Sequence, residues 1–253
     1  MRVVTFNANG IRSAARKGFF AWMIAANPDF VCIQETKAQE HQLPGDAVLA
    51  GYSAVYLDAE RKGYSGVAIY ARREPERIVK GLRSGFLNEE ARFLRFDYPD
   101  VSICSLYVPS GTSGVARQAV KYDFLEAFTA ELRGMRAEGR RIVLCGDFNI
   151  AHLDIDVFDP KSCARITGFL PPERAWFDRV TGELGWIDAF RVVNGDAKQF
   201  TWWASWKNAF ERNLGWRLDY QLVTPELAGG VRAAAIERGE RFSDHAPLTI
   251  DYA

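Results

Sequence analysis

Five apolar segments of the sequence end on polar side chains of the kinds that bind metal ions or transfer protons. They end on carboxylates, carboxamides and a histidine, namely Asn7, Glu35, Asp147 with Asn149, Asp219, and Asp244 with His245. Sites in layered α/β proteins are commonly assembled at strand ends, where side chains project from a rigid scaffold into a crevice. A single carboxylate after a strand more often caps a turn or a helix. Five such ends are harder to explain as caps and favour a shared site, although spacing alone does not show that they converge.

The residue types at these ends limit the chemistry. Oxygen ligands without clustered cysteine or histidine suit a hard cation, Mg²⁺ or Mn²⁺, rather than zinc. The sequence has three histidines, and an isolated histidine is more often structural than functional. His245 directly follows Asp244, and a carboxylate that orients an imidazole is typical of sites that protonate or deprotonate an oxygen near neutral pH.

Short apolar, β-branched segments predict the strands that must position these side chains. They lie at residues 3–6, 30–33, 67–71, 93–98, 101–108, 142–145, 218–223 and 247–252. The clearest helical pattern covers about residues 117–136, where apolar residues recur at spacings of three and four and Gly139 follows as a stop. A second helix is expected to begin after Pro171 and Pro172.

Strands mixed with fewer helices over the whole length predict an α/β fold in which β-sheets pack face to face with helices outside them. No low-complexity linker and no short internal repeat divides the chain, so residues 1–253 are expected to form one domain. No coiled-coil seam is visible, and a monomer is the expected state.

The composition is that of a globular protein, with 48% hydrophobic and 25% charged residues, which allows a large buried core. Lys and Arg number 32 and so do Asp and Glu, so any basic surface for nucleic acid must be local. Four cysteines without a CxxC pair indicate buried, reduced thiols. No apolar stretch approaches the ~20 residues of a bilayer span, and the N-terminus does not look like a signal peptide. We expect a cytoplasmic protein without a membrane partner.

Six motifs follow one another along the chain: FNANGIR at 6–12, QETK at 34–37, GYSGVA at 63–68, GDFNIA at 146–151, GWRLDY at 215–220 and SDHAP at 243–247. Together they resemble the signature blocks of the exonuclease III family of apurinic/apyrimidinic endonucleases. That family belongs to the larger endonuclease–exonuclease–phosphatase superfamily. Because the blocks extend from residue 6 to residue 247, the resemblance covers nearly the whole chain.

The resemblance implies a four-layer α/β sandwich, with two mixed β-sheets packed face to face, helices outside, and the site at one edge. It also implies a divalent-metal-dependent DNA repair phosphodiesterase that uses Mg²⁺ or Mn²⁺. In the family pattern Glu35 matches the principal metal ligand and Asn9 assists it. Asp244 matches a further ligand, direct or through water.

The same pattern implies catalytic roles for other residues. Asp147 matches the residue that orients or deprotonates the attacking water, while Asn7 and Asn149 hold this residue and the phosphate in place. His245, oriented by Asp219, matches the residue that binds a phosphate oxygen. This set is chemically coherent, because phosphodiester hydrolysis needs a positioned water and neutralisation of charge on the phosphate oxygens.

Family members select substrate with a small pocket for a flipped-out sugar without a base, which is cheap to extrude because little stacking is lost. Trp202, Trp216 and Leu218 match the apolar positions of this pocket, and each could equally be a core residue. Tyr107 matches a tyrosine that contacts the phosphate. Basic residues beside the site are candidates for phosphate contacts or are solvated surface charges: Lys37, Arg61, Lys62, Lys121, Lys161, Arg165, Lys207 and Arg217.

The expected activity is incision of double-stranded DNA on the 5′ side of abasic sites, with processing of blocked 3′ ends as a 3′→5′ exonuclease and 3′-phosphatase. Two loops depart from the family pattern. Residues 110–113 read SGTS where many relatives carry Gln-Gly or Asn-Ala-Gly, and Cys163 and Ile166 stand where relatives often place asparagine. These departures favour an alternative, an enzyme that is mainly a 3′-phosphatase or 3′-phosphodiesterase with weak abasic-site cutting. More distant alternatives are an enzyme for lipid or inositol phosphates and a catalytically inactive nucleic-acid-binding module of the same fold.

Overall fold

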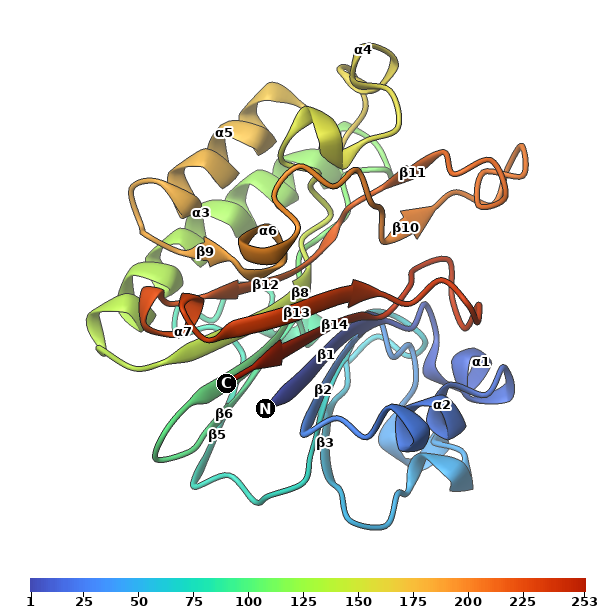
Figure 1. Cartoon of the computed structure of the whole chain (residues 1–253), viewed down its shortest axis with the longest axis vertical. Helices are drawn as coiled ribbons and strands as arrows, with labels where there is room; N and C mark the ends of the chain where they lie inside the picture. The colour runs from blue at the N-terminus through green and yellow to red at the C-terminus, as the bar shows by residue number, and fades with distance from the viewer.

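The computed structural model describes all 253 residues and contains two six-stranded sheets packed face to face (Figure 1). The first sheet consists of β13 (Val231–Ile236), β14 (Leu248–Tyr252), β1 (Arg2–Asn7), β2 (Phe30–Gln34), β4 (Val67–Ala71) and β3 (Ser53–Leu57), in this order. The second consists of β5 (Arg77–Lys80), β6 (Phe93–Asp97), β7 (Ser102–Tyr107), β8 (Ile142–Asp147), β12 (Asp219–Val223) and β9 (Ile187–Asp188). Both sheets are mixed, because β1 with β2 and β7 with β8 are parallel and the other pairs are antiparallel.

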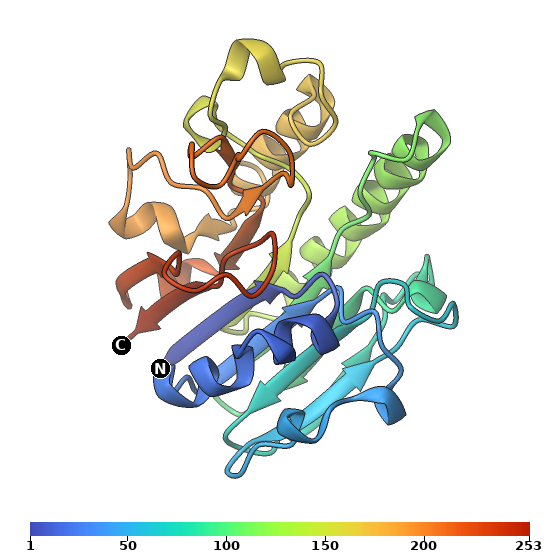
Figure 2. The same cartoon turned by 90° about the vertical axis from the view of Figure 1, so that its right-hand side faces the viewer.

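Helices cover the outer faces of both sheets and complete four layers. On the first sheet lie α1 (Ile11–Arg16) and α2 (Phe19–Ala26), and on the second lie α3 (Val115–Ala137) and α5 (Pro171–Thr181) (Figures 1 and 2). The shorter elements are α4 (Pro160–Cys163), α6 (Ala189–Val193), α7 (Pro225–Ala228) and a two-stranded ribbon of β10 (Trp202–Trp203) and β11 (Gly215–Trp216). The expected α/β sandwich is therefore confirmed.

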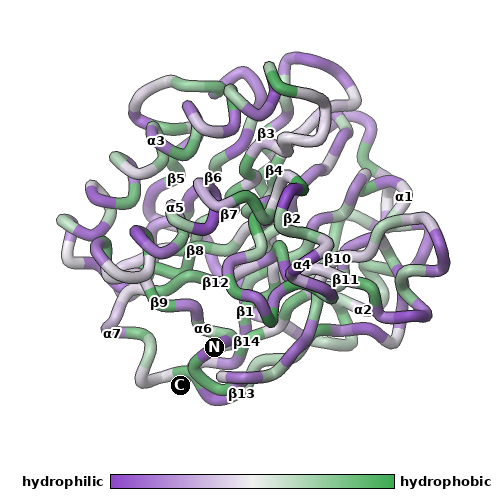
Figure 3. The backbone as a smooth tube through the Cα atoms, turned by 90° about the horizontal axis from the view of Figure 1, so that it is seen from above, coloured by the Kyte–Doolittle hydropathy of each residue, from purple (hydrophilic) through white to green (hydrophobic).

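The hydrophobic core is divided among these layers. Twenty-two buried residues, including Ile69 and Ile103, fill the space between the sheets. A cluster of 20 residues joins the second sheet to α3 and α5 through side chains such as Phe124 and Phe128, and a cluster of 18 joins the first sheet to α1 and α2. Figure 3 shows α3 alternating between apolar and polar segments, as expected for a helix with one buried face. This packing gives the strand ends a rigid support.

The sequence predicted the central elements better than the peripheral ones. The helix expected at 117–136 is α3, and the helix expected after the two prolines is α5. The strands β3, β5 and β13, which lie at or beside sheet edges, were missed, and so were α1 and α2. All four cysteines are free and buried, as expected. None of the helices is both long enough and apolar enough to cross a membrane.

Candidate active site

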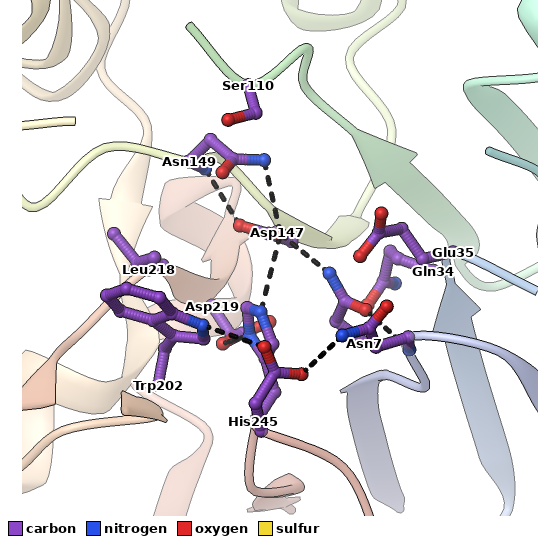
Figure 4. Close-up of polar contacts among 12 residues, drawn as sticks. Asn7, Gln34, Glu35, Ser110, Asp147, Asn149, Trp202, Leu218, Asp219 and His245 are labelled. Carbon is purple, nitrogen blue, oxygen red and sulfur yellow. Dashed lines mark hydrogen bonds and ion pairs between the residues drawn. The ribbon is translucent and has the colours of Figure 1, made fainter. Parts of the chain in front are cut away.

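The polar strand ends converge at one edge of the sandwich (Figure 4). Asp147 ends β8 and lies between Tyr107 at the end of β7 and Asp219 at the start of β12, its register partners on the two neighbouring strands. In the facing sheet, Asn7 ends β1 opposite Gln34 at the end of β2. An Asn7–Asp147 hydrogen bond of 2.8 Å joins the two sheets at this point. The predicted convergence is therefore a consequence of strand pairing.

Asp147 is held in one orientation by three hydrogen bonds. Asn7 Nδ2 donates to Asp147 Oδ2, the backbone N–H of Asn149 donates to Oδ1 at 2.8 Å, and Asn149 Nδ2 donates to Oδ2 at 3.2 Å. Asn149 reaches back in this way because its backbone is left-handed, with φ 51°, a conformation that asparagine tolerates better than most residues. Burial raises the pKa of Asp147 to about 7, and the nearby carboxylate of Asp219 adds to this effect against the attraction of His245. Asp147 therefore titrates in the range expected of a general base at neutral pH.

A second pair lies beside Asp147. His245 Nδ1 is 2.8 Å from Asp219 Oδ2, and His245 Nε2 is 4.0 Å from Asp147 Oδ2. Burial alone would lower the pKa of His245, but the carboxylate of Asp219 outweighs it and raises the pKa to about 10. The imidazole is therefore protonated at neutral pH, with Nδ1–H donated to Asp219. Its Nε2–H faces the Asp147 side of the site.

A cluster of oxygen ligands lies next to these groups. Asn9 Nδ2 donates to Asp244 Oδ1 at 2.9 Å, and Trp202 Nε1 donates to Asp244 Oδ2 at 3.1 Å. The ammonium group of Lys37 lies 3.2 Å from Glu35 Oε1 and donates to Asn9 Oδ1. The side-chain oxygens of Glu35 and Asn9 thus both contact one cation, the Lys37 ammonium. The Asp244 carboxylate belongs to the same cluster.

Two groups of side chains could hold a divalent metal. Asp147, Asp219 and His245 bring their ligand atoms within 4.8 Å of one another, and Asp219 Oδ1 is buried without a hydrogen-bond partner. The first group includes an imidazole nitrogen, which suits Mg²⁺ or Mn²⁺ less well than oxygen does. The cluster of Glu35, Asn9 and Asp244 offers only oxygen, which fits Mg²⁺ or Mn²⁺, and the Lys37 ammonium marks it as a cation-binding position. This oxygen cluster fits a hard metal ion better.

Asn9, Glu35, Asp147, Asp244 and His245 line a cavity of about 760 Å³. The apolar part of its wall contains the three residues expected to form a sugar pocket, Trp202, Trp216 and Leu218, together with Phe158, Ile166, Trp206 and Leu214. The rings of Trp202 and Trp216 meet edge to face at 6.4 Å. One cavity therefore combines a polar floor with an aromatic side.

Two residues expected to contact substrate do not reach the cavity. Arg217 is fully buried, and its guanidinium binds Asp156 at 2.7 Å and Asp188 at 2.7 Å beneath β12. Lys121 is fully buried as well, and its ammonium group binds Glu173 and the carbonyl oxygen of Asn149. Both side chains lack any path to a DNA phosphate, so their assignment to substrate binding was wrong.

The structure adds polar groups that the motifs did not indicate. The Arg92 guanidinium donates to the Tyr107 carbonyl oxygen at 3.0 Å and stacks 4.6 Å from the Tyr107 ring. Glu90 pairs with both Arg92 and Arg117 at the same end of the cavity. Burial, with Glu35 next in effect, raises the pKa of Tyr107, which keeps its hydroxyl protonated. These arginines resembled ordinary surface charges in the sequence, because only the fold brings them to Tyr107.

Acid–base groups, amide donors and a cation-binding oxygen cluster on the floor of one cavity are the components that hydrolysis of a phosphate ester requires. Residues 4–245 match the Endonuclease/Exonuclease/phosphatase family, and the chain belongs to that family. It is an enzyme of the exodeoxyribonuclease III-like, AP endonuclease type within it. The binding-module alternative is thereby set aside.

Relatives match over almost the full chain. The DNA repair nuclease APEX1 of Danio rerio is 34% identical over 99% of this chain and 81% of its own length. An exodeoxyribonuclease of Bacillus subtilis is 31% identical over 99% of this chain and 98% of its own. An AP endonuclease from Archaeoglobus fulgidus superposes with a TM-score of 0.90 at 30% identity, over 100% and 99% of the two chains. The 3′ phosphatase NExo from Neisseria, bound to a product DNA hairpin, gives 0.91 at 29% identity over the same shares.

Proposed function

We propose that this protein is a DNA repair phosphodiesterase that incises double-stranded DNA 5′ to abasic sites and also processes blocked 3′ ends. The observation that carries this proposal is the cavity, in which the polar floor around Asp147 adjoins the apolar wall of Trp202, Trp216 and Leu218. The polar floor suits a phosphodiester, and the wall suits a sugar that has lost its base. We further propose that the enzyme acts as a monomer, because one chain supplies every group of the site.

In the proposed reaction, water attacks the phosphorus on the 5′ side of the abasic sugar. Asp147 accepts the proton of that water, and Asn7 and Asn149 hold the Asp147 carboxylate in place. The bond from phosphorus to the 3′ oxygen of the preceding nucleotide breaks, and that oxygen takes up a proton from solvent water. The products are a 3′-hydroxyl and a 5′-phosphate on the abasic sugar. His245 donates Nε2–H to a phosphate oxygen, while Asp219 keeps the imidazole charged and correctly oriented.

Glu35, Asn9 and Asp244 are the residues that would hold Mg²⁺ or Mn²⁺. A bound ion supplies Lewis-acid stabilisation of the charge on the phosphate oxygens. The Lys37 ammonium, 3.2 Å from Glu35 Oε1, would have to leave this cluster for an ion to occupy it. The Tyr107 hydroxyl donates a hydrogen bond to the phosphate. Arg92 holds the Tyr107 backbone through the Tyr107 carbonyl oxygen.

A second candidate activity is favoured by the loop between α4 and α5. Ile166 is 47% exposed at the cavity wall, and Cys163 is fully buried, so neither supplies a polar contact to the DNA backbone. Because phosphate contacts fix the register of a protein on a duplex, we expect their absence to affect incision within an intact duplex more than removal of a terminal phosphate. On this alternative, release of 3′-phosphate is the main activity and abasic-site incision is weak.

One assay with two substrates tests both candidates. A duplex with a single tetrahydrofuran abasic analogue and a nicked duplex with a 3′-phosphate are incubated with Mg²⁺, with Mn²⁺ and with EDTA. Incision immediately 5′ to the analogue, abolished by EDTA, supports the proposal. Release of 3′-phosphate alone selects the second candidate, and no reaction on either substrate refutes both.

A further inference from the structure

A buried ion pair on the far side of the cavity floor connects the active site to two helices. Lys121 lies in α3 and Glu173 in α5, and both side chains are 0% exposed. The Lys121 ammonium group donates to Glu173 Oε1 and, at 2.7 Å, to the carbonyl oxygen of Asn149. Asn149 is the residue whose backbone and side chain both donate to Asp147. Asn149 is therefore the only residue between this ion pair and Asp147, the proposed general base.

Glu173 also binds the cavity wall opposite Lys121. Its Oε2 accepts from the backbone N–H of Gly168 at 2.6 Å and of Leu170 at 2.9 Å. Gly168 lines the cavity, and a Cβ there would lie 3.1 Å from the Asn149 carbonyl oxygen and 3.3 Å from the Trp216 ring. One carboxylate thus fixes both the backbone beside the apolar wall and, through Lys121, the backbone of Asn149.

The network continues into the first turn of α3 and the loop that precedes it. Gln118 Nε2 donates to Glu173 Oε1 at 3.1 Å, and the Thr167 hydroxyl donates to Gln118 Oε1. A Cβ at Gly111 would lie 1.8 Å from Gln118 Oε1 and 2.3 Å from Thr167 Oγ1, so the 110–113 loop packs directly on these side chains. Three cavity-lining segments, at 110–113, 149 and 166–168, are therefore joined through Glu173.

We infer that Lys121 and Glu173 are positioning residues, which hold Asn149 in its left-handed conformation and thereby fix the orientation of Asp147. This inference rests on the proposed function of Asp147. A buried ion pair is weak evidence for stability, because well-packed neutral residues can replace it without loss. Its value here is geometric, since Asn149 has φ 51° and its carbonyl oxygen accepts a hydrogen bond from Lys121 Nζ. Neither residue touches the substrate.

The test replaces both charges at once, in the double variant Lys121→Met with Glu173→Gln, so that neither partner is left as an unpaired buried charge. We expect kcat on the abasic-analogue duplex to fall roughly 10- to 100-fold, because small misplacements of a catalytic group cost rates of this order. KM should stay within about twofold, since the cavity groups that would touch substrate are retained. Single-turnover rates separate the chemical step from binding.

A local probe distinguishes positioning from general stability. In protein labelled with ¹⁵N-asparagine, the backbone and side-chain amide signals of Asn149 should shift and exchange faster with solvent, while those of the distant Asn27 stay fixed. The matched control removes another pair, through Arg95→Met with Glu138→Gln, which joins β6 to the end of α3 away from the cavity. The control should keep kcat and the Asn149 signals even if it melts earlier.

Unchanged kcat and unchanged Asn149 signals in the Lys121 and Glu173 variant would overturn the inference. An equal loss of kcat in the control would also overturn it, because the effect would then be one of stability. If the wild-type protein cleaves neither substrate, the proposed function fails. The Asn149 signals still decide whether the pair positions that residue.

Discussion

The Asp147 carboxylate combines burial with a fixed orientation. It is buried, which raises its pKa to about 7, and it accepts three hydrogen bonds from Asn7 and Asn149. The donors leave the carboxylate a single orientation, and burial makes it a stronger base than a solvated aspartate. A group with these properties is suited to accept a proton from water near neutral pH.

Asp147→Asn should therefore lower kcat roughly 10²- to 10⁴-fold on an abasic-analogue duplex, the range over which general acid–base groups contribute. The fold should survive, because the amide has nearly the same shape as the carboxylate. Single-turnover incision and a circular-dichroism melt measure the two effects. Wild-type rates in the variant would show that Asp147 does not take the proton.

The Trp202 side chain has two roles in the site. Its ring lines the cavity wall, and its indole N–H donates to Asp244 Oδ2 at 3.1 Å. The backbone of β10 also runs beside the Asp244 segment, because Trp203 N–H donates to the Asp244 carbonyl oxygen. The apolar wall and the oxygen cluster are thus connected through one side chain.

Trp202→Phe should separate these roles, since it keeps an aromatic ring and removes the donor. We expect the Mg²⁺ concentration for half-maximal activity to rise roughly 10-fold, in line with the loss of other groups that orient metal ligands. The preference for abasic over intact duplex should persist. Trp216→Phe, which alters a wall residue without a bond to Asp244, is the control, and an equal shift in both variants would contradict the assignment.

The sequence indicated site residues best where a polar side chain lies at the end of a predicted strand. Asn7, Asp147 and Asp219 were identifiable because each is a polar residue at a strand boundary. Lys121 and Arg217 were misassigned for the opposite reason. Their charges suggested phosphate, whereas the partners that bury them come from sequence positions 52 and 61 residues away, which no local pattern reveals.

At the scale of elements, a buried charge cluster holds the strand that carries Asp219. Arg217 precedes β12 and binds Asp156 of the 3₁₀ turn Asp154–Asp156 as well as Asp188 of β9. Arg191 of α6 binds Asp156 too. The cluster joins the 3₁₀ turn, β9, α6 and β12, and the next residue after Arg217, Leu218, lines the cavity.

Asp156→Asn should destabilise the protein by about 3–5 kcal/mol at pH 7, because Arg191 loses its carboxylate partner and the buried Arg217 keeps only Asp188. Burial alone would raise the pKa of Asp156, but Arg217 and Arg191 lower it overall. A lowered folded-state pKa stabilises the fold above the ordinary aspartate value near 4 and loses that effect as pH falls through the lowered value. The difference between wild type and variant should stay constant from pH 7 to pH 5 and shrink toward pH 3.

Urea unfolding at these three pH values measures the difference. Asp178→Asn is the control, because the Asp178 side chain is 71% exposed and pairs only with His152, so its effect should stay within about 0.5 kcal/mol. A pH-independent difference for Asp156→Asn would contradict the electrostatic origin. A decrease of less than about 1 kcal/mol in the free energy of unfolding would contradict the magnitude expected for loss of a buried ion pair.

Peripheral elements escaped sequence-based prediction for physical reasons. The edge strand β13 has two exposed alanines, Ala233 and Ala235, at its centre, and β5 is mostly exposed. The helix α2 reads Phe-Phe-Ala-Trp-Met-Ile-Ala-Ala, which is apolar on every side and so lacks helical periodicity. Central strands are buried on both faces and leave continuous apolar runs, which is why they were recognised.

At the scale of the whole molecule, the site depends on both sheets. Asn7 belongs to the first sheet and Asp147 to the second, and the chain ends lie together, with the N-terminal amine donating to the Tyr252 carbonyl oxygen at 2.7 Å (Figure 1). The sandwich fixes the distance between the sheets through its 22-residue inner core. The site therefore requires the complete fold.

In the proposed mechanism, water activated beside Asp147 attacks the phosphorus on the 5′ side of an abasic site. Incision of an abasic-analogue duplex with Mg²⁺ in ¹⁸O-water, followed by mass spectrometry of both fragments, tests it most directly. One ¹⁸O atom is expected in the new 5′-phosphate and none in the new 3′-hydroxyl. An ¹⁸O atom in the new 3′-hydroxyl would instead show attack at the sugar carbon and would refute this mechanism.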